Sequence, residues 1–262
     1  MIRVHGHRGA RAVLPENTIP GFDYAIKLGV HAIEMDVVVT KDGVVVVSHD
    51  PEMNRGFCRG PAGTTVIRKM TFAELQRWDC GAIANPYFPK QRAVPAARIP
   101  ALSEVLALAP LASFDFHIEA KPVLQLSPTS FAQLILEQIR LHEVQSRVAL
   151  LSFDYRILHE MKRLDPYIPL CALYESGPRT YLSLAEESGA SIVSPRYTTV
   201  TPAKVEEAHK AGLQIVAWTA SQPRGWNKLI AAKVDAIVTD DPAGLIAYLK
   251  KPTSSFFPPR AR

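Results

Sequence analysis

The most constraining feature of this 262-residue chain is a regular alternation of apolar, strand-like runs with amphipathic helical stretches. It starts with a strand over Ile2–His7 and a helix over Asn17–Leu28, and it ends with a helix over Ala243–Leu249. The strands expected between these ends are Ala32–Val39, Val44–Ser48, Phe114–Glu119, Val148–Leu151, Pro169–Leu173, Ser191–Ser194, Gln214–Trp218 and Ala236–Thr239. About eight strands with helices between them predict an α/β protein, and the length favours a closed (β/α)₈ TIM barrel over an open sheet.

One segment interrupts this alternation. Residues 51–100 are rich in Pro, Gly and Arg, and a connection of this length is usually functional or a small subdomain. We therefore expect one barrel domain over residues 1–250, with an insertion at about 51–100 that overhangs the barrel mouth. The Pro- and Ser-rich residues 251–262 are expected to form a disordered tail.

Composition limits the partners. The net charge of +5 and the pI of about 9.1 come without a Lys/Arg cluster interleaved with aromatic residues, so no nucleic-acid partner is expected. No apolar run approaches the ~18 residues of a spanning helix, so no stable membrane insertion is expected either. Cys58, Cys80 and Cys171 are odd in number and lack CxxC spacing, which predicts free thiols and a cytoplasmic location. The oligomeric state stays open.

Three acidic residues lie where predicted strands end, namely Glu34, Asp36 and Glu119. Side chains two apart on a strand share a face, and the carboxyl ends of barrel strands meet at one mouth. Each acid could simply pair with a nearby Arg or Lys, but clustered carboxylates repel one another and call for a cation. Oxygen ligands suit Ca²⁺ or Mg²⁺, with Mn²⁺ as a third candidate. The sequence therefore predicts one divalent cation at this mouth.

His7 and His49 are the predicted acid and base, because imidazole titrates near neutral pH. A single histidine is more often structural, whereas two beside an acidic cluster favour proton transfer. His5 shares a strand face with His7 and is the alternative candidate.

Three further side chains are predicted to bind substrate. Arg8 offers a planar fork suited to phosphate, although it could instead pair with Glu16 or Glu34. Lys121 offers a point charge, and its alternative is the Schiff-base lysine of a barrel aldolase. Trp218 could form a wall for the alcohol part of a substrate or simply pack at the barrel rim.

Taken together in order and spacing, these motifs resemble the glycerophosphodiester phosphodiesterases over nearly the whole domain. The motifs are His7-Arg8-Gly9, Pro15-Glu16-Asn17-Thr18, Glu34-Met35-Asp36-Val37, Thr40-Lys41-Asp42-Gly43, Ser48-His49-Asp50, Ile99-Pro100-Ala101-Leu102, Ile118-Glu119-Ala120-Lys121 and Thr239-Asp240-Asp241-Pro242. Trp218-Thr219 also fits, but Ser221 stands where the family often has asparagine.

The resemblance implies a TIM barrel with one divalent cation, two catalytic histidines, two phosphate-binding cations and an insertion after the second histidine, at the positions named above. It further implies hydrolysis of glycerophosphodiesters, such as glycerophosphocholine, to glycerol 3-phosphate and an alcohol in glycerophospholipid metabolism. Which histidine is the acid, and whether water or a glycerol hydroxyl attacks the phosphate, stay open.

Three alternatives remain. A lysophospholipase D or sphingomyelinase-D-like enzyme would need an apolar exposed loop, for which the insertion offers only Phe57 and Tyr87-Phe88. A phospholipase-C-like barrel would stop at a cyclic product. A metal-binding barrel without turnover is disfavoured because both histidines and all three acids are present.

Overall fold

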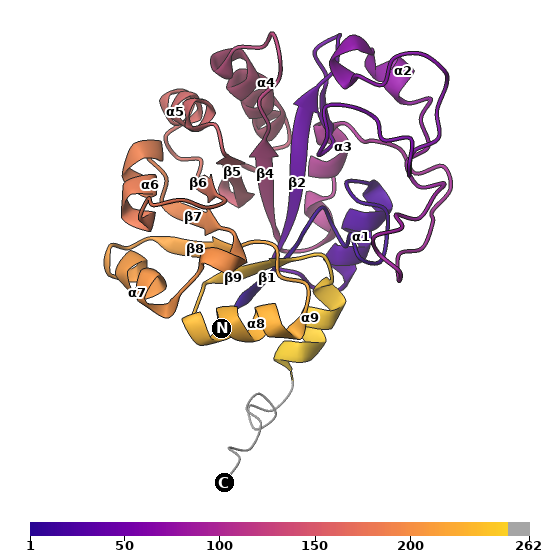
Figure 1. Cartoon of the computed structure of the whole chain (residues 1–262). Coiled ribbons are helices and arrows are strands. Elements are labelled where there is room, and N and C mark those ends of the chain that lie inside the picture. Colours follow the sequence, from indigo (N-terminus) through magenta and orange to yellow (C-terminus); the bar gives the residue numbers. More distant parts are fainter. Residues whose placement is uncertain (251–262) are drawn as a thin grey trace.

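The computed structural model describes residues 1–250 and contains a closed barrel of eight parallel strands (Figure 1). The strands follow the order β1-β9-β8-β7-β6-β5-β4-β2, and β2 pairs with β1 to close the ring. Their bounds are β1 Arg3–Gly6, β2 Ala32–Val39, β4 Asp115–Ala120, β5 Val148–Ser152, β6 Leu170–Tyr174, β7 Ile192–Pro195, β8 Gln214–Ala217 and β9 Ala236–Thr239. The predicted barrel is confirmed, while the tail predicted over 251–262 lies outside the described residues.

Helices surround this ring on the outside (Figure 1). They are α1 Ile19–Lys27, α3 Leu102–Leu106, α4 Pro128–Leu141, α5 Tyr155–Leu164, α6 Tyr181–Ser188, α7 Pro202–Lys210, α8 Pro223–Ala232 and α9 Pro242–Leu249. Helix α4 begins three residues before the apolar periodicity suggests, because the Ser127 side chain accepts from the Ser130 N–H and Pro128 occupies the first turn.

The short strand β3 (Val45–Val47) stands outside the ring and pairs antiparallel with the far end of β2. A turn at Lys41-Asp42-Gly43, with Gly43 at φ 86°, reverses the chain between the two strands. The hairpin returns to the level of the mouth, where the Ser48 N–H donates to the Asp36 carbonyl at 2.9 Å. This return places the next residue, His49, beside the acidic strand.

Two sets of apolar side chains flank the strands. Outward-facing residues such as Ile33, Met35 and Phe116 pack against the helices in the main core. A second set fills part of the barrel interior, and it consists of Ala149, Leu151, Cys171, Leu173, Ile192, Val216, Ala236 and Val238. All of these interior residues belong to β5–β9, so one side of the barrel interior is apolar.

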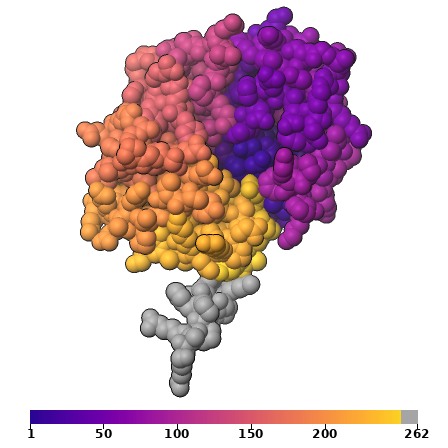
Figure 2. All heavy atoms as spheres, viewed as in Figure 1, coloured from indigo at the N-terminus to yellow at the C-terminus, as the bar shows by residue number. Residues whose placement is uncertain are grey.

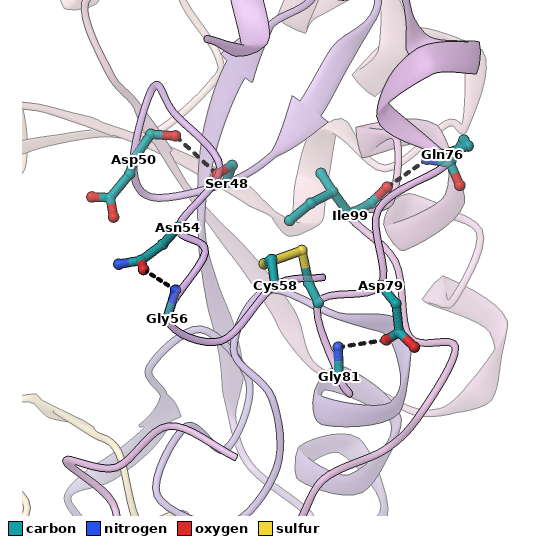
Figure 3. The surroundings of a disulfide bond; sticks show 10 residues. Ser48, Asp50, Asn54, Gly56, Cys58, Gln76, Asp79, Gly81 and Ile99 are labelled. Atoms are coloured by element: carbon teal, nitrogen blue, oxygen red, sulfur yellow. Dashed lines mark hydrogen bonds between the residues drawn. A yellow bond between two sulfur atoms is a disulfide. The ribbon is translucent and has the colours of Figure 1, made fainter. Parts of the chain in front are cut away.

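The insertion contains a short helix, α2 (Phe72–Leu75), and packs residues such as Trp78 against Val38 of β2 and Val46 of β3 in a small second core. Within it, Cys58 and Cys80 form a disulfide with a Cα–Cα distance of 4.0 Å (Figure 3). The prediction of three free thiols is therefore wrong for this pair and confirmed only for the buried Cys171. The error arose because irregular backbone, rather than sequence spacing, brings these cysteines together. The expected cytoplasmic location loses the support of that argument and stays a prediction.

No helix within the described part of the chain is both long and apolar enough to span a membrane.

Candidate active site

The three predicted acids converge at the carboxyl ends of two neighbouring strands. Glu34 and Asp36 lie on β2, and Asp36 is in register with Glu119 on β4. One carboxylate oxygen from each residue lies within 4.8 Å of the other two, and all three side chains are largely buried. Hard oxygen donors at this spacing suit Ca²⁺, Mg²⁺ or Mn²⁺. The residues therefore fit a divalent cation.

The pKa values of the three acids are shifted in different directions. Burial, together with the charges of Asp36 and Glu119, holds the pKa of Glu34 well above its usual value. Burial and the neighbouring Asp36 raise the pKa of Glu119 from 4.5 to about 7. Burial would also raise the pKa of Asp36, but Arg8 and Lys121 outweigh it and hold that pKa below its usual range. Two of the three acids are thus costly to ionise until a cation compensates their charge.

Arg8 lies in a tight loop directly after β1, with left-handed backbone at Arg8 (φ 49°) and Gly9 (φ 88°). Its backbone N–H donates to Glu34 Oε2 at 3.0 Å, and its Nη1 donates to Glu16 at 2.7 Å. Its Nε is 3.2 Å from Asp36 Oδ2. The guanidinium therefore pairs with Glu16, as one alternative predicted, and with Asp36, whereas Glu34 is contacted only by the Arg8 backbone.

Lys121 follows β4 and points at the same acids. Its Nζ lies 2.7 Å from Glu119 Oε1 and 3.2 Å from Asp36 Oδ1. Burial would lower the pKa of this ammonium, but the two carboxylates outweigh it and raise the pKa. Lys121 is thus charged, which suits phosphate binding and disfavours a Schiff-base role, for which the amine must be neutral.

His7 follows β1 and faces the acidic cluster. Its Nδ1 lies 2.6 Å from Asp240 Oδ1, and its Nε2 lies 3.9 Å from Glu34 Oε2. Burial lowers the pKa of His7, while the hydrogen bond to Asp240 opposes that shift. The second oxygen of Asp240 accepts from the Ser221 hydroxyl at 2.9 Å, and Ser221 accepts from the Asp240 N–H in return. Ser221 thus has a clear contact at the site despite its departure from the family pattern.

His49 lies at the same mouth, beyond the end of β3. Its Nδ1 is 2.7 Å from Asp50 Oδ1, and its side chain is 36% exposed. His5, the alternative candidate, is buried below the mouth. Its ring packs edge-on against that of His117, with 4.4 Å between the ring centroids. His5 lines a different cavity, so the geometry favours His7 and His49 as the proton-transfer pair.

A cavity of about 320 Å³ opens above these groups, and Figure 2 shows the indigo N-terminal residues recessed near the centre of this face. Its opposite wall carries Phe153 and Trp218, whose rings meet edge-to-face at 5.8 Å. The Trp218 indole N–H donates to the Ser194 carbonyl at 2.8 Å, so both rim packing and substrate contact are compatible with its position.

None of residues 51–100, which form the insertion, lines this cavity, which corrects the expectation that the insertion overhangs the mouth. The insertion instead contacts one residue that does line the cavity, Arg11: Phe88 packs on its guanidinium at 4.8 Å, and Gln91 donates to its carbonyl at 2.7 Å.

Asp240 is the site residue whose part the sequence alone did not reveal. It belongs to the Thr239-Asp240-Asp241-Pro242 motif at the end of β9, and 233 positions separate it from His7. In a closed barrel the last strand adjoins the first, so an acid at the end of β9 falls beside the residue that follows β1. The closure of the barrel was thus the signal from which the contact between Asp240 and His7 could have been predicted.

Comparison with known proteins agrees with this geometry. Residues 7–244 match the model of the glycerophosphoryl diester phosphodiesterase family. The chain belongs to this family. It is 32% identical over 248 residues to a glycerophosphodiester phosphodiesterase of Caldanaerobacter subterraneus subsp. tengcongensis, covering 95% of this chain and 98% of that protein. A Bacillus altitudinis glycerophosphodiester phosphodiesterase is 30% identical over 250 residues, covering 92% and 96%. The chain is thus an enzyme of the phosphoric diester hydrolase class.

Solved structures show the same barrel. A putative glycerophosphoryl diester phosphodiesterase from Silicibacter pomeroyi superposes with a TM-score of 0.87 at 30% identity, covering 92% of this chain and 90% of that one. An Oleispira antarctica phosphodiesterase in complex with the product sn-glycerol-3-phosphate gives a TM-score of 0.83 at 24% identity, covering 95% and 97%.

Proposed function

We propose that this protein is a metal-dependent phosphodiesterase that hydrolyses small glycerophosphodiesters, such as glycerophosphocholine, to glycerol 3-phosphate and an alcohol. The observation that carries the proposal is the buried acidic cluster of Glu34, Asp36 and Glu119, with both predicted histidines at the same mouth. The relatives' activity supports the reaction class, and the product bound to the Oleispira antarctica protein supports the phosphorylated product.

The charges at the mouth match those of a phosphodiester. A divalent cation held by Glu34, Asp36 and Glu119 would neutralise the phosphate and could also hold the glycerol hydroxyls. Arg8 and Lys121 add two fixed positive charges beside the same acids. Binding at this mouth would therefore weaken the repulsion between the phosphate and the attacking oxygen.

His7 and His49 supply the proton transfers. The Asp240 carboxylate accepts the Nδ1–H of His7. The other ring nitrogen of His7, Nε2, is therefore available for proton transfer. If water attacks, one histidine takes its proton and the other gives a proton to the oxygen of the leaving alcohol. If a glycerol hydroxyl attacks, the same transfers give a cyclic phosphate, which water then opens with the two histidines in reversed roles. In the first case the number of protons on the pair is unchanged, and a proton passes back between the histidines through solvent before the next turnover.

The substrate is a small molecule rather than an acylated lipid. The mouth is a charged cavity of about 320 Å³, comparable with the low end of typical small-molecule sites. A lysophospholipase D would need an apolar surface to approach a bilayer, and of the three aromatic residues noted in the insertion only Tyr87 is strongly exposed. This contrast favours the soluble glycerophosphodiester over the lysolipid.

A side-by-side rate comparison tests the proposal. Glycerophosphocholine and glycerophosphoethanolamine should be cleaved faster than lysophosphatidylcholine, with glycerol 3-phosphate as the phosphorylated product. EDTA should abolish turnover, and Ca²⁺, Mg²⁺ or Mn²⁺ should restore it. Faster cleavage of the lysolipid would support the lysophospholipase D alternative, a cyclic phosphate as the final product would support the phospholipase C alternative, and metal binding without turnover would support a binding protein.

A further inference from the structure

His49 differs from the other site residues in how it is held. The acids, His7, Arg8 and Lys121 all lie on a barrel strand or within two residues of its end, whereas His49 lies in an irregular segment after β3. The hydrogen bond described for its ring goes to the adjacent Asp50, at 2.7 Å, which belongs to the same segment. The backbone before His49 is anchored to β2 by the bond from the Ser48 N–H to the Asp36 carbonyl, so the remaining freedom of His49 depends on the backbone that follows it.

That backbone runs directly to one half of the disulfide. From Asp50 the chain continues to Cys58, and Cys58 and Cys80 line a small cavity of about 40 Å³ together with Ser48, His49 and Asp50. Figure 3 shows the segment from Ser48 through Asn54 passing beside the sulfur atoms. Two backbone hydrogen bonds also hold this segment, from Ile67 to Pro51 at 2.9 Å and from Met53 to Thr65 at 2.8 Å.

The two halves of the disulfide are anchored unequally. The Cys80 N–H donates to Ala97 at 2.7 Å, and the Asp79 carboxylate accepts from Gly81 at 3.0 Å and from Ala96 at 2.8 Å. This half leads to Pro100, whose carbonyl accepts from Val47 on β3 at 2.9 Å. The Cys58 half follows the exposed residues 54–56, and beside the disulfide it is held by the Cys58 N–H bond to the Asn54 carbonyl and by the backbone pair of Arg59 with Asp79. The disulfide thus adds a covalent link between an exposed turn and a segment fixed on the barrel.

We propose that the Cys58–Cys80 disulfide is a positioning element for His49, so that a dithiol reductant slows hydrolysis while the barrel stays folded. The inference rests on the proposed role of His49. In the reduction, a dithiol is oxidised to a disulfide, and its two electrons and two protons convert the Cys58–Cys80 bond into two thiols.

Reduction is expected to lower kcat only in part and to leave KM and the fold nearly unchanged. Arg59 and Asp79 exchange two backbone hydrogen bonds, at 2.8 and 2.7 Å, which remain after reduction and keep the insertion together. Loosening His49 by about an ångström should lower kcat by roughly 10-fold and at most about 10²-fold. KM for glycerophosphocholine should change little, because the acids, Arg8 and Lys121 are held by barrel strands and the loop after β1.

The experiment compares kcat and KM of the oxidised protein, the protein reduced with dithiothreitol, and the double variant Cys58→Ser/Cys80→Ser. Alkylation and mass spectrometry confirm the thiol state, and circular dichroism confirms the fold. Cys171→Ala is the matched control, because that buried cysteine lies in the barrel interior and its removal should not change the response to dithiothreitol. Reoxidation of the reduced protein should restore kcat.

Two backgrounds separate positioning from general structural damage. In His49→Ala the disulfide should no longer affect the residual rate, whereas in His7→Ala its reduction should still lower that rate. An equal loss in both backgrounds, an unchanged kcat with both thiols confirmed, or loss of the barrel signal on reduction would overturn the inference. An oxidised wild-type protein that hydrolyses no glycerophosphodiester would instead contradict the proposed function itself.

Discussion

The barrel interior has two unlike halves. The three acids, His7, Arg8 and Lys121 lie on or just after β1, β2 and β4. On β5–β9 the interior is filled by apolar side chains such as Leu173 and Val216, and the charged groups Glu175 and Asp240 lie beyond the strand ends. The charged half contains two acids, Glu34 and Glu119, whose pKa is raised by burial, so it opposes folding unless their charge is compensated. The apolar half of the interior and the helices outside therefore stabilise the fold, which leaves the charged half free for chemistry.

The largest effect is expected from the charged half. Glu34→Ala should remove the bound cation and lower turnover by roughly 10³-fold or more, because a cation at the phosphate contributes several kcal/mol. The free energy of unfolding without metal should not fall, since the change also relieves repulsion with Asp36 and Glu119. Metal content and turnover are measured on the same samples, with Glu206→Ala on the exposed face of α7 as control. Undiminished activity with unchanged metal content would refute the assignment of the ligands.

The histidines should come next. His7→Ala or His49→Ala should lower the rate by roughly 10²–10⁴-fold, the range of general acid–base catalysis, without unfolding the protein. His5→Ala is the internal control and should leave the rate nearly unchanged, because His5 lies below the mouth. Steady-state kinetics of the three variants show which histidines transfer protons. A larger loss for His5→Ala than for His7→Ala would show that the wrong histidine was chosen.

A smaller change is expected for Lys121. Lys121→Met should raise KM and lower kcat together, by about 10-fold each, because its Nζ acts beside Glu119 and Asp36 on the same phosphate. Lys210→Met, a surface lysine on α7, is the control. If borohydride instead traps substrate on the wild-type protein, mass spectrometry will reveal the adduct, and the hydrolase proposal will fail.

The apolar half should give the opposite result. Ile192→Ala should lower the free energy of unfolding by roughly 2–5 kcal/mol, the cost of a large-to-small change in a core, while the rate stays within about threefold. Urea unfolding and turnover of this variant are compared with those of Glu34→Ala. A rate loss in Ile192→Ala as large as that in Glu34→Ala would erase the distinction between the two halves.

The sequence predicted most of this arrangement because strand periodicity and barrel geometry act locally. Once Glu34 and Asp36 are placed two apart at a strand end, and Glu119 at the end of the neighbouring strand, their meeting follows from the barrel. The same reasoning located His7 and Lys121, and the barrel itself is confirmed.

Contacts that depend on irregular backbone or on chain closure were not predicted. The disulfide joins Cys58 to Cys80 through an insertion without periodicity, so no pattern indicated the pairing. Asp240 reaches His7 only because β9 closes against β1. The insertion was expected to wall the mouth, yet it contacts Arg11 without lining the cavity, a distinction that requires side-chain geometry.

The sign of the pH dependence follows from the raised carboxylate pKa values. Without a cation, the folded protein holds its protons more tightly than the unfolded chain, so Glu119 makes the free energy of unfolding fall as pH rises from about 4.5 to about 7. A cation competes with these protons, so its affinity should increase over the same range.

The decisive measurement of the cation site is calorimetric titration of Ca²⁺, Mg²⁺ or Mn²⁺ into the metal-free protein at several pH values across 7. We expect one ion per chain, proton release on binding, and affinity that rises as pH increases through about 7, the pKa of Glu119. Glu34→Ala should lose this binding. No bound ion, or binding that neither pH nor Glu34→Ala changes, would show that the three acids do not form a cation site.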